Sequence, residues 1–104
     1  MSRIDTLKEF LKADPDDSFS RYALALEYVK LGQHDDALLE FETVKQNDPD
    51  YVATYYQLGQ LYKTLGRMHE AEKTLRTGII AAAKAGDEHT RSELEAALEM
   101  LNEG

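Results

Sequence analysis

The sequence predicts an all-α fold of antiparallel helix–turn–helix repeats, and three observations indicate it. Residues 55–71 repeat the pattern of residues 21–37, which lie 34 positions earlier. Gly32 and Gly66 hold matching places in the two stretches, where a chain turns between two helices. Two Asp-Pro pairs also stand 34 positions apart, and a residue before proline is disfavoured in a helix. We therefore expect roughly five to seven helices, preferably six, stacked as a short right-handed solenoid.

The repeated positions carry matching residue types. The aligned pairs are Tyr22 with Tyr56, Leu24 with Leu58, Tyr28 with Tyr62, Ala37 with Ala71, and Phe41 with Leu75. This pattern resembles the tetratricopeptide repeat family, whose first helix reads W-x-x-L-G-x-x-Y and whose second reads A-x-x-x-F before a proline. Tyr55 stands in the Trp place of the second repeat, whereas Arg21 stands there in the first and Ala25 replaces the Gly. The resemblance covers roughly two-thirds of the chain.

The predicted organisation is one domain over residues 1–104. Its parts are an N-terminal flanking helix (2–13), repeat 1 (16–49), repeat 2 (50–85) and a C-terminal capping helix (87–102). Ser2 and Asp5 form a partial capping box for the first helix. The second helix of repeat 2 has no proline at the expected end, so it should be about one turn longer than its counterpart. Within it, Gly78 should cost about 1 kcal/mol, which close helix approach would explain.

The last predicted helix does not continue the repeat. Ser92 and Ala96 occupy the Leu and Tyr places of a third repeat, so the large residues that it needs are absent. We interpret this helix as a cap, and we expect Glu93, Glu95 and Glu99 to form an acidic outer face that keeps the end of the stack soluble.

The composition restricts the function classes. A net charge of −8 disfavours a nucleic-acid partner, which a basic face would attract. The acid excess suits a solvated surface, although a basic partner or a salty environment stays open. The sequence has no cysteine, no signal-peptide pattern and no apolar run of membrane-spanning length, so we expect a cytoplasmic protein without a membrane partner. Met1 at the start and Gly104 at the end suit a complete small protein.

Catalytic and metal-binding motifs are missing from the sequence. His34, His69 and His89 have no second ligand at metal spacing. The stretch at His69 begins like H-E-x-x-H, but Lys73 stands in the second His place. There is no glycine-rich phosphate loop and no nucleophile elbow. We expect no enzyme, no cofactor and no metal.

The family resemblance and helical periodicity together indicate a concave binding face on the first helix of each repeat. The candidate residues are Phe19, Tyr22, Leu26, Val29, Lys30, Tyr56, Gln60 and Lys63. Chaperone-binding members of the family hold a terminal carboxylate with Lys and Asn on this face. Here Tyr22, Leu26, Tyr56 and Gln60 stand in those places, so that clamp is absent. The alternative is that a flanking helix folds over these side chains.

The function that we predict is a protein–protein interaction module that binds a peptide or helix of a partner in this face. The first alternative is a homodimer formed through the face or through the end helices, with Phe10, Leu11, Leu98 and Leu101 as candidates. The second is an enzyme with an unrecognised site, which a pocket with two convergent ionisable groups would favour.

Overall fold

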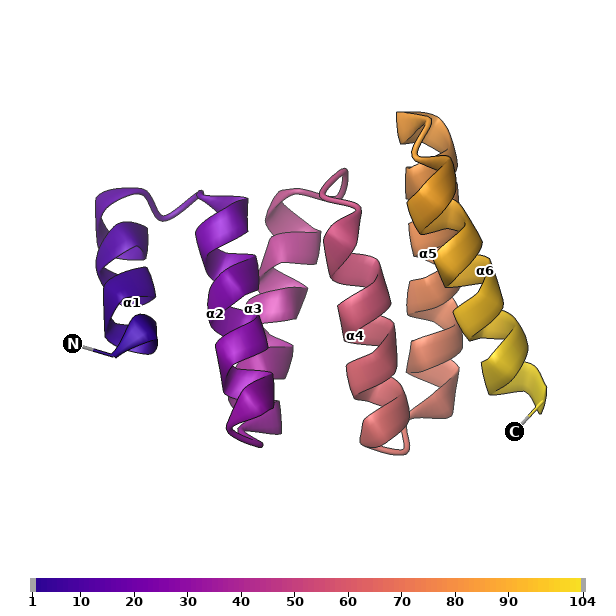
Figure 1. Cartoon of the computed structure of the whole chain (residues 1–104), viewed down its shortest axis with the longest axis horizontal. Coiled ribbons are helices and arrows are strands. Elements are labelled where there is room, and N and C mark those ends of the chain that lie inside the picture. Colours follow the sequence, from indigo (N-terminus) through magenta and orange to yellow (C-terminus); the bar gives the residue numbers. More distant parts are fainter. Residues whose placement is uncertain (1, 104) are drawn as a thin grey trace. The chain divides into compact units, whose positions relative to one another are not determined.

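The computed structural model describes residues 2–103, and these residues form six α-helices (Figure 1). The helices are α1 (Arg3–Ala13), α2 (Ser18–Lys30), α3 (His34–Asn47), α4 (Ala53–Thr64), α5 (Met68–Ala85) and α6 (Glu88–Glu103). The predicted all-α fold and the expected number of helices are confirmed over this part of the chain. Met1 and Gly104, on which the expectation of a complete protein depends, lie outside the described residues.

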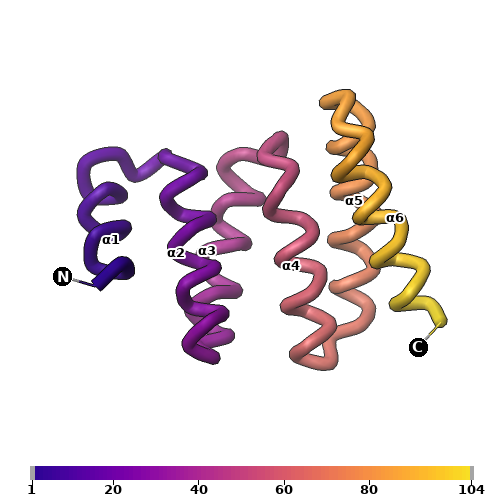
Figure 2. The backbone as a smooth tube through the Cα atoms, in the orientation of Figure 1, coloured from indigo at the N-terminus to yellow at the C-terminus, as the bar shows by residue number. Residues whose placement is uncertain are grey.

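The chain forms two compact units, Met1–Asp48 and Pro49–Gly104. The first unit contains α1, α2 and α3, and the second contains α4, α5 and α6. Figure 2 follows the backbone through each unit, in which consecutive helices run in opposite directions. The boundary between the units falls inside the second Asp-Pro pair, where we expected the break between repeats. The prediction of a single domain with four parts stays a prediction.

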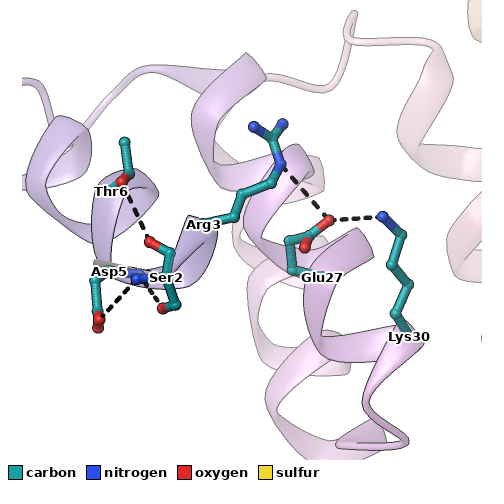
Figure 3. Close-up of polar contacts among 6 residues, drawn as sticks. All are labelled: Ser2, Arg3, Asp5, Thr6, Glu27 and Lys30. Atoms are coloured by element: carbon teal, nitrogen blue, oxygen red, sulfur yellow. Dashed lines mark hydrogen bonds and ion pairs between the residues drawn. The ribbon is translucent and has the colours of Figure 1, made fainter.

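Helix α1 is capped and tied to α2 by polar contacts (Figure 3). The Asp5 N–H donates to the Ser2 hydroxyl at 3.1 Å and the Ser2 N–H donates to the Asp5 carboxylate at 3.3 Å, which completes the capping box. One carboxylate oxygen of Glu27 lies 3.6 Å from Arg3 Nε and 3.0 Å from Lys30 Nζ. Such exposed pairs contribute little energy, so apolar packing must hold α1 in place.

The two repeat turns use the same backbone conformation. Gly32 has φ of 71° and Gly66 has φ of 76°, values that a residue with a Cβ adopts only with strain. In each turn the N–H of the residue after the glycine donates to the carbonyl five residues before it, at 2.9 Å and 2.8 Å. These bonds satisfy carbonyls that the helix end would otherwise leave free.

Arg21 and Tyr55, which stand in the Trp place of the two repeats, make the same kind of hydrogen bond although their side chains differ in chemistry. Arg21 Nη2 donates to the carbonyl of Pro15 at 2.9 Å, and the Tyr55 hydroxyl donates to the carbonyl of Pro49 at 2.6 Å. Arg21 also pairs with Glu40 at 2.7 Å, and both side chains are largely buried. Each repeat thus fixes the loop before its first helix with one long side chain.

Helix α5 confirms two expectations from the sequence. It has 18 residues against 14 for α3, so it is longer by about one turn. A Cβ at Gly78 would lie 2.5 Å from Tyr55 Cβ and 3.1 Å from Leu94 Cδ1. Glycine is therefore needed at this point because α4 and α6 both approach α5 closely there.

Candidate functional site

Three of the predicted site residues converge on one pocket in the second unit. Tyr56, Gln60 and Lys63 line a cavity of about 290 Å³ between α4 and α6. Its other lining residues come from α6: Glu93, Ala96, Ala97 and Met100. We call this cavity the α4–α6 pocket.

The pocket follows from helical spacing and from side-chain size. Tyr56, Gln60 and Lys63 are four and three positions apart, so they lie on one face of α4. On α6, Ala96 and Ala97 have small side chains, which leaves a hollow between longer neighbours.

The side chains of the pocket differ in how far they are free to contact a ligand. Tyr56 is half-buried and packs against the unit's hydrophobic cluster, so only part of its ring faces the pocket. Met100 is 63% exposed, and a flexible thioether at this exposure can adapt its shape to an apolar ligand.

The pocket has a charged group on each side. Lys63 is exposed and makes no ion pair within residues 2–103. On the α6 side, Glu93 lies 3.7 Å from His89 Nε2, a contact that is an ion pair only when the imidazole is protonated. The pocket therefore combines an apolar hollow with one available cation and one anion.

The other predicted site residues lie on α2, in the first unit. They are Phe19, Tyr22, Leu26, Val29 and Lys30. The Tyr22 ring packs 5.9 Å from the ring of Phe41, so it belongs partly to the packing of that unit. Phe19 is 63% exposed, whereas Lys30 is engaged with Glu27 at 3.0 Å. That these residues join the α4–α6 pocket in one groove stays a prediction.

Sequence reasoning did not identify the α6 side of the pocket. We expected Glu93 to share an acidic outer face with Glu95 and Glu99, but Glu93 lines the α4–α6 pocket while the other two line a groove beside α5. Positions 93 and 95 lie about 200° apart around a helix, so they cannot share one face. The adjacent small residues Ala96 and Ala97 were the available signal. Helix α6 flanks the predicted face of α4 at this pocket, and that a flanking helix covers the whole face stays a prediction.

The three histidines lie at the starts of helices, His34 on α3, His69 on α5 and His89 on α6. Over residues 2–103, no three His, Asp or Glu side chains are placed to hold a metal ion. In the same range, every helix is too short or too polar to cross a membrane.

Family models and known proteins that match the chain include several described by the tetratricopeptide repeat. Two family models described as "Tetratricopeptide repeat" match residues 28–89 and residues 6–39. The chain is 44% identical to a tetratricopeptide repeat domain protein from Salinibacter ruber, whose solution structure aligns with 85% of this chain and 89% of that one at a TM-score of 0.81. A TPR repeat-containing protein of Pseudomonas aeruginosa is 25% identical over 99 residues, which are 95% of this chain and 94% of that protein.

A more distant likeness extends to the TPR2B domain of yeast Sti1, solved as a complex with pHsp70. It has 17% identity and a TM-score of 0.89, over 96% of this chain and 80% of that one. At this identity the likeness concerns the fold alone.

Proposed function

The chain belongs to the tetratricopeptide repeat family, and on that premise we propose that it is a non-catalytic interaction module that binds a peptide or helix of another protein. The observation that carries this proposal is the convergence of Tyr56, Gln60 and Lys63 on the α4–α6 pocket. These are residues that the repeat pattern predicts for the concave face. The proposed ligand places an apolar side chain in the hollow over Ala96 and Ala97.

The Sti1 domain supports this kind of ligand, since a domain of the same fold was solved with pHsp70 bound. The ligand of this chain should differ in chemistry. Tyr56 and Gln60 stand where the chaperone-binding members carry their carboxylate clamp, and Lys63 contributes a cation to the lining of the α4–α6 pocket. We infer a segment with an apolar anchor and an acidic residue about one helical turn away, within reach of Lys63.

The pocket is better suited to recognition than to catalysis. Lys63 and Glu93 are its two charged groups, and both are exposed to solvent. A general acid or base is normally held by a partner group and screened from water, so that its proton affinity matches the reaction. Within the described residues, Lys63 has no such holding contact. A solvent-exposed apolar hollow with charges at its rim is typical of a contact site.

The experiment is a selection of peptides from a random library on the full chain, followed by measurement of Kd for the selected peptides. Ala96→Phe should fill the hollow, and Lys63→Glu should repel the acidic residue. Each is expected to weaken binding at least tenfold, because the apolar anchor or the charge contact is lost.

Lys8→Glu is the matched control for Lys63→Glu. Lys8 is an exposed lysine without an ion pair within residues 2–103, and it lies on α1, so its reversal should leave Kd unchanged. Failure to select any peptide, or equal binding by all three variants, would contradict the proposed function.

A further inference from the structure

A second surface of the same unit is not used by the proposed function. It is an open groove of about 730 Å³ on the other side of α6, between α6 and α5. We call it the α5–α6 groove; its lining residues are Arg76, Ile79, Glu95, Leu98, Glu99, Asn102 and Glu103. The apolar side chains in it, Ile79 and Leu98, are half-buried and pack against the unit's hydrophobic cluster.

The α5 side of this groove carries two cations. Arg76 lines the groove, and Lys73 lies three positions earlier on the same side of α5. Both residues border an adjoining hollow of about 300 Å³, together with His69, Glu72, Thr77 and Ile80, of which Ile80 is 64% exposed. We call Lys73 and Arg76 the cationic ridge.

The α6 side of the groove is acidic. Glu95, Glu99 and Glu103 follow one another at intervals of four, which places them in one row along α6. We call them the acidic ridge. Within residues 2–103, Glu99, Glu103 and Lys73 make no ion pair, and Arg76 pairs only with its neighbour Glu72, at 3.1 Å. Most of these charges are therefore available to a partner.

We propose that the partner of this surface is a second copy of the same chain. When two copies face each other across a two-fold axis that runs along the groove, α5 of each copy lies opposite α6 of the other. Each cationic ridge then meets an acidic ridge, and Ile79 and Leu98 pack across the seam. Such self-complementarity is what an isologous dimer requires, because both copies use the same patch.

The size of the surface sets the strength that we expect. Helices of 18 and 16 residues are about 25 Å long, and two adjacent helices are about 20 Å wide, so each copy contributes about 500 Å². The total of about 1,000 Å² is at the lower limit for a specific interface. The dimer should therefore be weak and should appear only as concentration rises.

The test is a charge-reversal exchange on the full chain, followed by sedimentation velocity over a range of concentrations. One variant combines Glu95→Lys with Glu99→Lys, and the other combines Lys73→Glu with Arg76→Glu. Each variant alone faces like charge with like charge and should weaken dimerisation at least tenfold. An equimolar mixture of the two should restore the dimer, because every reversed ridge then meets a reversed partner.

The control variant combines Glu9→Lys with Glu42→Lys in the first unit, which gives the same change in net charge as Glu95→Lys with Glu99→Lys and should dimerise like the wild type. Circular dichroism of every variant checks that the helices are retained. Even a weak dimer should form at a concentration of about 1 mM. A wild-type chain that stays monomeric up to that concentration would overturn the proposal. So would a mixture of the two variants that stays monomeric.

The proposed dimer and the proposed function can be contradicted independently of each other. The α5–α6 groove and the α4–α6 pocket share no lining residue, so the charge-reversal variants should bind selected peptides as the wild type does.

Discussion

Gly78 offers the most direct test of the packing that shapes the second unit. Replacing a mid-helix glycine with alanine normally stabilises a helix by about 1 kcal/mol. At this position the new Cβ would lie 2.5 Å from Tyr55 Cβ and 2.9 Å from Tyr55 Cγ. Favourable carbon–carbon contacts occur near 3.5–4.0 Å, so the helices must separate by about 1 Å.

Tyr55 cannot move aside to relieve this overlap. It is 1% exposed, its hydroxyl donates to the Pro49 carbonyl at 2.6 Å, and Cβ moves only with the backbone. Overpacking of this kind costs about 3 kcal/mol at the upper end of the usual range. After the gain in helix propensity, Gly78→Ala should lower the free energy of unfolding by about 2 kcal/mol.

The assay is urea unfolding followed by circular dichroism, with Gly59→Ala as the matched control. With a slope of about 1–2 kcal/mol per molar urea, Gly78→Ala should lower the midpoint by about 1–2 M. A Cβ at Gly59 would lie 2.6 Å from Cδ2 and 2.9 Å from Cγ of Leu75, atoms that can shift by side-chain rotation without moving the backbone, and the first repeat already carries Ala25 at that place. Its midpoint should change much less. A Gly78→Ala protein as stable as the wild type would refute the reasoning.

Three further predictions concern polar groups, and urea unfolding checks each. The Thr54 hydroxyl is fully buried and has no hydrogen-bond partner within residues 2–103, so Thr54→Val should raise the free energy of unfolding by about 1 kcal/mol, and a loss would contradict this. Arg21→Ala should lower it by about 1–2 kcal/mol, because Glu40 loses its largely buried partner at 2.7 Å; an unchanged midpoint would show that the pair contributes nothing. The Thr90 hydroxyl and N–H donate to the Asp87 carboxylate at 2.7 Å and 3.1 Å and lower the pKa of Asp87. Unfolded Asp87 therefore takes up a proton more readily than folded Asp87, so this stabilisation is present at neutral pH and is lost as pH falls below about 4. Asp87→Asn should show a smaller loss of stability between pH 7 and pH 3 than the wild type, and an equal loss would contradict the assignment.

The repeat landmarks were sufficient to predict most of the fold. A 34-residue self-match fixes which residues face the partner helix, and the burial of Tyr28, Phe41 and Tyr62 follows from it. The need for glycine at position 78 could also be predicted, because a mid-helix glycine has a cost that only close packing offsets. These features depend on the spacing of residues along the chain, which can be read from the sequence.

The α6 side of the pocket could not be predicted in the same way. Helix α6 begins 35 residues after α4, as α4 does after α2, but it lacks the large residues of the repeat pattern, since Ser92 and Ala96 stand in the Leu and Tyr places and are exposed. Its orientation depends on packing against α4 and α5. Which of its faces meets Tyr56 and Lys63 is decided by that packing. The shared role of Arg21 and Tyr55 could not be predicted either, since a guanidinium and a phenol differ in chemistry but each donates to the proline carbonyl before its own helix, Pro15 and Pro49 respectively.

The location of ligand binding tests the account most directly. An isotope-labelled chain can be titrated with a library-selected peptide, and amide chemical shifts recorded by NMR show which residues respond. We expect the strongest shifts at the α4–α6 pocket, at Gln60, Lys63, Ala96 and Met100. Shifts confined to the outer row of α5, around Lys73 and Arg76, would contradict this expectation.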